Sequence, residues 1–250
     1  MHLRRLSWLL LLLLAPIFAK AGSVLIFPVN PRIAGDEKAV AVWIENQGSA
    51  PLRIQARVQA WEQGDEGEVL TPQTSVAGSP SMMQILPGKR QMLRLIRVQP
   101  TPAGAEQAYR VLIDELDAGP VAPQANGVRL QMRYSVPLFV QGPGLGQADT
   151  RGDAVAKGLR WRLQRDKGSS YLVVRNEGAV SARLSAVGLL NPDGTKTDIV
   201  AGLLGYVHPR RQMRWKLPGA PAGSEGQTLS ARINDDHAPT SIAPSPMQEE

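Results

Sequence analysis

The sequence of 250 residues contains no cysteine and only 3 histidines. The absence of thiols excludes a disulfide framework, a thiolate metal site and a cysteine nucleophile. Beyond the first 21 residues the histidines are His208 and His237, so a site built from His and Cys ligands is excluded as well. We expect His208, which precedes Pro209-Arg210-Arg211, to lie in a solvated turn.

The usual sequence signatures of catalysis are also missing. No Walker motif, other glycine-rich phosphate loop or Gly-x-Ser-x-Gly elbow occurs. Two adjacent carboxylate pairs, Asp114-Glu115 and Asp235-Asp236, are present. Neighbours on a strand point to opposite faces, so neither pair makes a two-carboxylate active site. The sequence therefore predicts a protein that is not an enzyme and that needs no metal or cofactor.

Long apolar runs are absent except at the N-terminus, where the order of segments is that of a secretion signal. The basic residues Arg4 and Arg5 precede a Leu-rich stretch from Leu6 to Leu14, and Ala19-Lys20-Ala21 is a cleavage motif. The alternative is an uncleaved anchor, but the run is shorter than the roughly 20 residues that span a bilayer. We expect residues 1–21 to be removed, leaving an exported chain without a membrane span.

The charge balance gives little support to a nucleic-acid partner. The formal net charge is +6, and Arg4, Arg5 and Lys20 of the predicted leader supply three of these charges. Electrostatic recognition of nucleic acid needs a clustered basic patch rather than a mild excess of charge. We therefore expect no nucleic acid among the partners.

What the chain does contain is a series of short strands separated by turn signals, typical of antiparallel immunoglobulin-like sandwiches. A Pro/Gly-rich stretch at 141–146 separates two such regions. The turn that ends Val42–Gly48 also resembles the one that ends Leu172–Gly178, each with Asn-x-Gly, which indicates one turn solution used twice or two related sandwiches. The prediction is an all-β fold with sandwiches at 22–141 and 142–234 and a disordered tail at 235–250.

The segment from Val128 to Pro137 alternates strictly between apolar and polar residues. Side chains on a strand alternate between its two faces. An ordinary half-buried strand has this pattern, and so does a strand that offers its apolar row to another protein. The residues of that row are Val128, Leu130, Met132, Tyr134 and Val136.

Several short motifs across residues 23–141 occur in an order and spacing that resemble one known family. They are Asn30-Pro31-Arg32-Ile33, the strand end at Asn46, Val58-Gln59-Ala60-Trp61, Leu70-Thr71-Pro72, Leu86-Pro87-Gly88 and the Tyr109-Arg110 strand that reaches Glu115. Together with the strand ending at Val140, they resemble the periplasmic chaperones of the chaperone–usher pilus pathway. The archaic branch, also called Csu or spore-coat type, is the most similar, and the second domain matches only in general character.

The resemblance implies two immunoglobulin-like domains set as a boomerang, and a function in the periplasm. Such chaperones donate the last strand of their first domain to a pilus subunit that lacks its own final strand, and deliver the subunit to an outer-membrane usher. Here the donor residues would be the apolar row from Val128 to Val136. Since an exposed apolar row is an aggregation hazard, we expect the free protein to cover it by self-association or with the loop at 117–127.

The resemblance also implies two basic residues that bind the C-terminal carboxylate of the subunit. Arg32 matches the first and Arg133 is the nearest match to the second, with three further cations left open as the second anchor: Lys89, Arg94 and Arg97. A strand-edge arginine contributes little to stability, so we expect the fold to survive the loss of Arg32.

The alternative class is a secreted immunoglobulin-like module for adhesion or carbohydrate binding. Such modules often expose aromatic side chains, but aromatics make up only 5% of this sequence. Four of the tryptophans lie within predicted strands as core candidates: Trp43, Trp61, Trp161 and Trp215.

Overall fold

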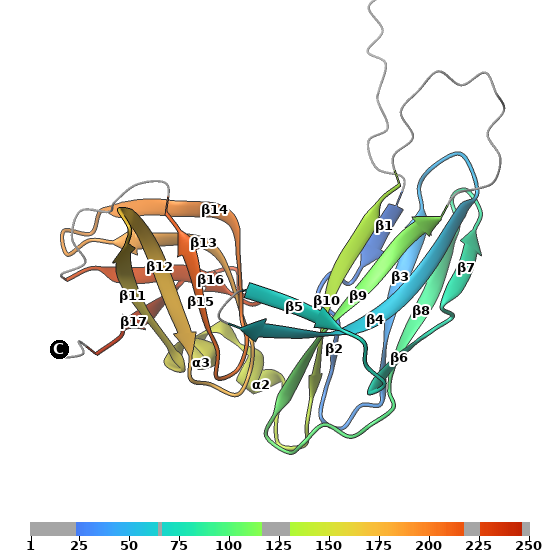
Figure 1. The fold of residues 1–250 in the computed structure, drawn as a ribbon, viewed down its shortest axis with the longest axis horizontal. Helices are drawn as coiled ribbons and strands as arrows, with labels where there is room; N and C mark the ends of the chain where they lie inside the picture. The colour runs from blue at the N-terminus through green and yellow to red at the C-terminus, as the bar shows by residue number, and fades with distance from the viewer. Residues whose placement is uncertain (1–23, 65–66, 117–130, 218–225, 247–250) are drawn as a thin grey trace, which may run out of the picture.

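The computed structural model describes residues 24–64, 67–116, 131–217 and 226–246, which form two β-sandwich domains set at an angle to each other (Figure 1). The predicted all-β class with two immunoglobulin-like domains in an L-shaped arrangement is thereby confirmed. The predicted leader lies outside the described residues. Within those residues, no helix has the length and apolar character needed to cross a membrane.

The N-terminal domain is a sandwich of two sheets. The first has the strand order β1 (Val24–Phe27), β3 (Ala39–Asn46), β8 (Arg90–Arg97), β6 (Val76–Ser79). The second has the order β2 (Arg32–Ile33), β10 (Arg133–Gln141), β9 (Glu106–Leu116), β4 (Leu52–Gly64), β5 (Gly67–Thr71), and β7 (Met82–Ile85) also pairs with β4.

The core of this domain lies between the two sheets and follows from the period-2 pattern of the strands. Val42 and Ile44 of β3 alternate inward and are fully buried, as are Val111 and Ile113 of β9. Burial of each such side chain contributes roughly 1.5–3 kcal/mol of hydrophobic free energy, before the opposing chain entropy. The core holds β9 and β10 in fixed register, and that register positions the candidate site.

The C-terminal domain begins with two short helices, α2 (Gln147–Thr150) and α3 (Gly152–Lys157). Its strands have the order β14 (Lys196–Val207), β13 (Ala182–Leu190), β16 (Thr228–Ile233), β17 (Thr240–Pro244), β11 (Leu159–Asp166), β12 (Ser169–Asn176), β15 (Gln212–Lys216). The prediction of a disordered tail from 235 is wrong at β17, which pairs with β16 and β11 and buries Ile242 completely. A strand of five residues with a single buried side chain gives no periodic signal in the sequence.

The two Asn-x-Gly turns are structurally equivalent. In the first domain the Asn46 amide donates to the carbonyls of Ala50 and Ile85, and its Oδ1 accepts from Gly48 N–H at 2.9 Å. In the second, the Asn176 amide donates to the carbonyls of Val180 and Val207, and its Oδ1 accepts from Gly178 N–H at 2.9 Å. Each asparagine is buried and satisfies main-chain groups that would otherwise be unpaired. Both domains therefore use the same turn to close one end of the sandwich.

Candidate functional site

Strand β10 has an open edge. All of β10 pairs with β9, whereas β2 reaches only Phe139 and Val140. From Arg133 to Leu138 no other described strand pairs with β10. The Phe139 N–H donates to the Pro31 carbonyl at 3.3 Å, so the odd-numbered residues of β10 direct their main-chain groups toward this edge. Pro137 is one of them, and its missing N–H therefore costs no bond to β9.

The apolar row of β10 emerges from the core toward the start of the strand. Leu138 and Val136 are buried between the sheets. Tyr134 is half-buried against the same core, and its hydroxyl donates to Glu115 Oε1 at 2.9 Å. Met132 is 47% exposed. The row thus changes from core packing to an accessible apolar surface within a few residues, beside the open edge.

The structure places the predicted donor residues in different environments. Met132 and Tyr134 lie at the open edge, as expected for side chains offered to a partner. Val136 is only 7% exposed and packs in the core of its own domain, so its assignment to the donor row is corrected. Val128 and Leu130 lie outside the described residues.

Arg133 lies on the opposite face of β10 and forms part of a cluster across three strands. It pairs with Asp114 of β9, which also accepts from Arg57 Nη2 of β4 at 2.7 Å. Burial disfavours the charged form of Asp114, but the hydrogen bonds from Arg133 and Arg57 prevail and lower its pKa. Arg133 therefore joins the strands of its own sheet.

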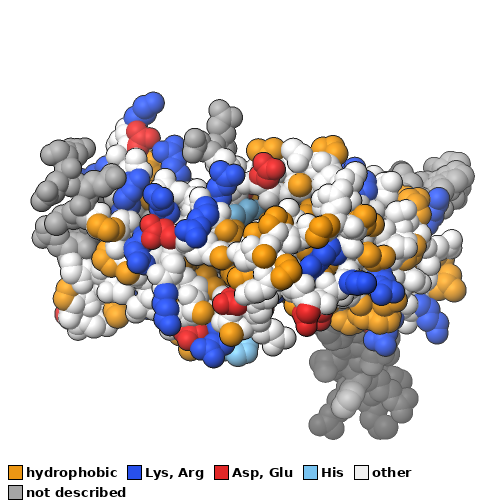
Figure 2. Space-filling model, turned by 90° about the horizontal axis from the view of Figure 1, so that it is seen from below, with side chains coloured by type: hydrophobic (Ala, Val, Ile, Leu, Met, Phe, Trp, Pro, Cys, Tyr) orange, Lys and Arg blue, Asp and Glu red, His pale blue; other side chains and the backbone are white. Residues whose placement is uncertain are grey.

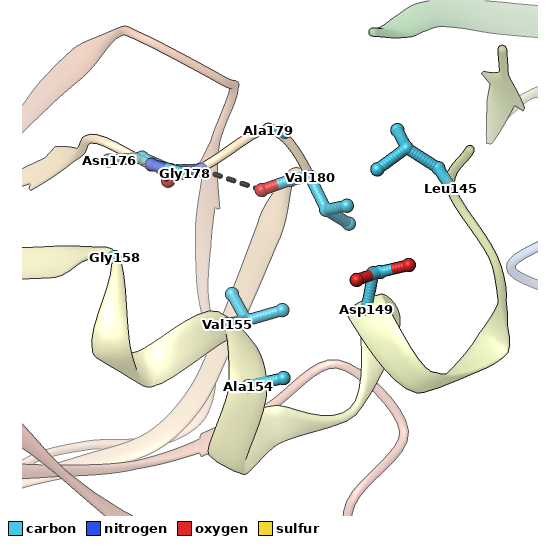
Figure 3. Close-up of a pocket in the computed structure, with 9 residues that line it drawn as sticks. All are labelled: Leu145, Asp149, Ala154, Val155, Gly158, Asn176, Gly178, Ala179 and Val180. Carbon is cyan, nitrogen blue, oxygen red and sulfur yellow. Dashed lines mark hydrogen bonds between the residues drawn. The ribbon is translucent and has the colours of Figure 1, made fainter. Parts of the chain in front are cut away.

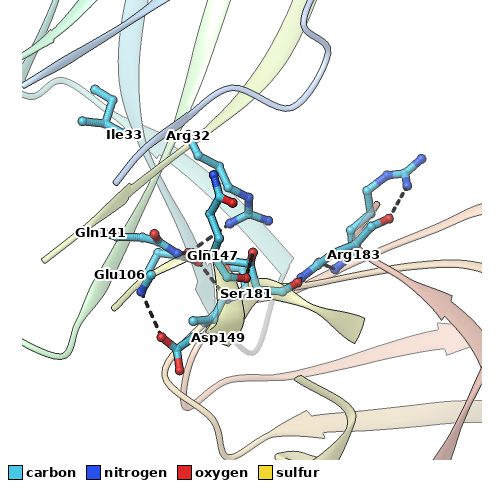
Figure 4. A network of polar contacts seen from close by, with 12 residues as sticks. Arg32, Ile33, Glu106, Gln141, Gln147, Asp149, Ser181 and Arg183 are labelled. Atoms are coloured by element: carbon cyan, nitrogen blue, oxygen red, sulfur yellow. Dashed lines mark hydrogen bonds and ion pairs between the residues drawn. The ribbon is translucent and has the colours of Figure 1, made fainter. Parts of the chain in front are cut away.

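Arg32 lies at the junction between the domains (Figure 4). Its Nη1 is 3.1 Å from Oε2 of Glu106, and its guanidinium carbon is 4.8 Å from the Phe139 ring centroid. The side chain of Glu106 is fully buried and also accepts from the main-chain N–H of Ser181, in the second domain, at 2.8 Å. Burial raises the pKa of Glu106, although the charge of Arg32 opposes that effect. Arg32 thus neutralises a buried carboxylate that links the two domains.

The structure does not bring the two predicted anchors together. Arg32 is opposite Phe139 in the register of β2 and β10, and Arg133 is six residues earlier on β10. At about 3.3 Å per residue, that separation is roughly 20 Å along the strand. The expectation that Arg32 and Arg133 bind one carboxylate is therefore wrong in this geometry.

The three other candidate cations do not replace Arg133. Arg97 donates to the main-chain carbonyls of Ile33, Ala34 and Gly35, and so holds a loop of its own domain. Arg94 belongs to the four-stranded sheet and Lys89 immediately precedes the same strand, β8; both are exposed.

An aromatic cluster joins the domains beside Arg32. Trp61 of β4, Phe139 of β10 and Tyr206 of β14 have ring centroids 5.1–6.1 Å apart. Gln63 donates to the Tyr206 carbonyl at 2.9 Å and accepts from the His208 N–H at 2.8 Å. Tilted and edge-to-face aromatic pairs, together with buried hydrogen bonds, stabilise one mutual orientation. The cluster therefore fixes the angle between the domains.

Arg110 is a residue of this site that sequence reasoning missed. Its guanidinium carbon is 3.6 Å from the Trp61 ring centroid and 5.5 Å from that of Tyr206, and it pairs with Glu68 at 3.5 Å. Burial lowers the pKa of Arg110 although Glu68 opposes the shift. Arg110 and Arg32 thus flank the same aromatic cluster. Tyr109-Arg110 belongs to one of the family motifs, but alternation alone does not show that Arg110 faces the second domain.

His208 corrects the expectation of a solvated turn. It is 5% exposed, and its ring centroid lies 4.2 Å from that of Trp61. Burial, with a smaller contribution from the charges of Arg110 and Arg211, lowers its pKa to about 3. The imidazole is therefore neutral at physiological pH and packs as part of the domain junction. The local sequence carries no sign of this burial, because Trp61, which covers His208, comes from the other domain.

The depressed pKa of His208 predicts a pH-dependent stability. The unfolded chain takes up a proton near pH 6.5 and the folded chain only near pH 3, so the stabilisation is complete above pH 6.5 and is lost as the pH falls from 6.5 toward 3. Between pH 6.5 and 4.5 this loss amounts to roughly 2–3 kcal/mol. Glu106, whose pKa is raised, acts in the opposite direction.

Urea unfolding at a series of pH values would measure this component. We expect His208→Phe, which keeps a ring against Trp61, to lose less stability between pH 6.5 and 4.5 than the wild type. If the free energy of unfolding falls equally with pH in the two proteins, His208 is not buried in its neutral form.

Two of the hollows in the described part of the chain lie near the junction of the domains. One, of about 230 Å³, is lined by residues that include Trp61, Gln107 and His208. The other, of about 140 Å³, lies between the short helices and the Asn176 turn (Figure 3). The Asn176 side chain in its wall is fully occupied by main-chain partners. Among the described residues no group of three His, Cys, Asp or Glu side chains could hold a metal ion.

Comparisons with known proteins agree with this architecture. Residues 30–146 match the family model for the pili and flagellar-assembly chaperone PapD N-terminal domain. The chain is 30% identical to a chain in the CsuC–CsuE chaperone–tip adhesion subunit pre-assembly complex of archaic Csu pili from Acinetobacter baumannii, with a TM-score of 0.70, over 90% of this chain and 100% of that one. No curated protein matches.

More distant structures share the fold alone. A chain of the Salmonella enterica SafA pilin–SafB chaperone complex is 16% identical, with a TM-score of 0.66 over 90% of this chain and 97% of that one. The YadV chaperone is 19% identical, with a TM-score of 0.63 over 88% of this chain and 97% of that one. The family model and the CsuC–CsuE match show that the chain belongs to the pilus chaperones of the chaperone–usher pathway, in their archaic branch.

Proposed function

We propose that this protein binds an incomplete pilus subunit in the periplasm by adding β10 to it as a strand, and then delivers the subunit to an outer-membrane usher. The observation that carries the proposal is the open edge of β10 beside an apolar row that leaves the core. A subunit that lacks its last strand exposes an apolar groove and unpaired sheet edges. An added strand supplies main-chain hydrogen bonds, and alternate side chains fill the groove.

The donor row is proposed to run from Val128 through Leu130, Met132 and Tyr134. Val136 marks its end, because that side chain belongs to the core of the chaperone. Each apolar side chain that enters a groove contributes up to roughly 1.5–3 kcal/mol, from which association and ordering costs subtract. In the free protein the row is proposed to be covered by self-association or by the loop at 117–127.

The carboxylate of the subunit is proposed to bind at the domain junction, with Arg32 as the first anchor. The ion pair with Glu106 engages Nη1 of Arg32, and a guanidinium has five N–H donors in a planar fork. Arg110, on the other side of the same aromatic cluster, replaces Arg133 as the proposed second cation. Arg133 keeps its partner Asp114 and holds β10 against β9.

The proposed activity is that of a chaperone, not of an enzyme, and it requires no cofactor.

The proposed binding of a subunit can be tested by co-expression with a pilus subunit that lacks its final strand, followed by recovery of the subunit from the periplasm. We expect the subunit to be recovered in a one-to-one complex with this chain and to be degraded or aggregated without it. Recovery that does not depend on this chain would overturn the proposal.

The alternative of an adhesion or carbohydrate-binding module gains no specific support. Trp61 and Trp161 are each 2% exposed, so neither offers a ring to a sugar. Trp43, expected in the core, lies half-buried on the outer face of its sheet. The guanidinium carbon of Arg90 stacks over it, 4.7 Å from the Trp43 ring centroid.

A further inference from the structure

The outer face of β11, β12 and β15 in the C-terminal domain carries a cluster of cations that the proposed chaperone function does not use. Figure 2 shows Lys and Arg side chains gathered over this domain. In the strand register, Arg160 of β11 lies opposite Arg175 of β12. Val173 of β12 lies between Arg162 of β11 and Arg214 of β15. Lys216 of β15 lies opposite Tyr171 of β12. We refer to Arg160, Arg162, Arg175, Arg214 and Lys216 as the basic face.

The carboxylates near the basic face are too few to neutralise it. Within the described part of the chain only two pair with it: Asp166 with Arg214 at 3.5 Å and Glu177 with Arg175 at 3.7 Å. Both pairs are solvent-exposed and therefore weak. The remaining cations raise the local density of positive charge, which the modest net charge of the whole chain conceals.

The arrangement is unfavourable for the domain itself. Like charges directly opposite each other on antiparallel strands are destabilising, and Arg160 and Arg175 are such a pair. Val173, between the cationic side chains, is only 1% exposed although it is absent from the sandwich core. Long arginine stems cover apolar surface in this way while their charged ends remain in water. Because these cations destabilise the domain by repelling one another, we expect the basic face to bind an external anion.

We infer that the basic face docks the C-terminal domain on a membrane surface rich in anionic phospholipid headgroups. The cations lie on the outer face of three adjacent strands, and neither described hollow is lined by them. Cations spread over the face of a sheet, away from both of these hollows, fit an extended anionic surface better than an acidic peptide, which needs pockets or a free strand edge for register. The basic face is distinct from the open edge of β10, which belongs to the other domain.

The test is sedimentation of the full chain with vesicles of phosphatidylglycerol and phosphatidylcholine, compared with vesicles of phosphatidylcholine alone. We expect binding to the anionic vesicles that weakens as salt is raised. Each cation near an anionic surface raises the partition constant of the protein onto the vesicles about fivefold. The double variant Arg162→Gln/Lys216→Gln should therefore bind the anionic vesicles roughly 25-fold more weakly than the wild type. The matched control Lys89→Gln/Arg94→Gln removes the same charge from the other domain and should change binding by less than about twofold.

Two results would overturn the inference. One is a failure of the wild-type chain to bind anionic vesicles at low salt, or an equal loss in the control. The other is displacement from the vesicles by an acidic polypeptide that binds the basic face more tightly, which would identify a protein partner instead. Inorganic phosphate at matched ionic strength should not compete, which separates a lipid surface from a free phosphate site. Subunit recovery in co-expression should be unchanged in the Gln variants, so this test and the test of chaperone function can fail separately.

Discussion

Replacement of Met132 by Asp is expected to abolish subunit capture while leaving the free protein as stable as the wild type. Met132 is 47% exposed and is not among the core residues of its own domain, so an aspartate there should not disturb that core. In a complex the same side chain would enter an apolar groove, where an unpaired carboxylate loses its hydration without compensation. Loss of the methionine contact and burial of the charge together should weaken binding by more than about a hundredfold.

The matched control for this experiment is Met82→Asp. Met82 is 49% exposed on β7, and β9 and β4 separate that strand from β10 in the sheet. Affinity for a purified subunit and the urea midpoint of the free protein are the two measurements. Equal binding by both variants would remove Met132 from the donor row, and unfolding of Met132→Asp alone would place Met132 in the core of its own domain.

Removal of Arg32 is expected to have two effects, and the second one corrects the expectation from sequence. Loss of a charge-assisted contact to a buried carboxylate should weaken subunit binding by roughly 2–5 kcal/mol. Arg32→Ala also leaves Glu106 buried without its cation, which should lower the free energy of unfolding by up to about 3–5 kcal/mol. The fold therefore should not be indifferent to this change.

The double variant Arg32→Ala/Glu106→Gln separates the two effects. It removes the cation and the buried negative charge together, while Gln keeps an oxygen that can accept from the Ser181 N–H. Its unfolding free energy should lie well above that of Arg32→Ala, whereas its subunit binding should remain weak. Wild-type affinity in the double variant, measured by titration with purified subunit, would show that Arg32 is not an anchor.

The architecture could be predicted from sequence because it depends on local patterns. Period-2 alternation and turn residues identify strands, and the Asn-x-Gly echo anticipated the equivalent turns at Asn46 and Asn176. β17 could not be predicted in this way, because a strand with one buried residue shows no alternation of apolar and polar side chains. The order of motifs was sufficient to indicate the family before any contact was known.

The site could be predicted only in part, because its geometry depends on strand register and on contacts between domains. Alternation placed Arg133 on the polar face of its strand, but only pairing with β9 and β2 shows that it lies far from Arg32. The burial of His208 depends on Trp61, and the role of Arg110 depends on Tyr206. Both partners lie in the other domain, far away along the chain. The basic face likewise assembles from three strands whose charges look scattered in sequence.

Amide hydrogen exchange along β10, with and without a bound subunit, tests strand addition most directly. The N–H groups of Arg133 and Ser135 face the open edge, whereas those of Tyr134 and Val136 face β9. If a subunit strand adds at this edge, Arg133 and Ser135 should change from fast to slow exchange on binding, and Tyr134 and Val136 should be protected in both states. A stable complex in which Arg133 and Ser135 still exchange rapidly would contradict strand addition at β10.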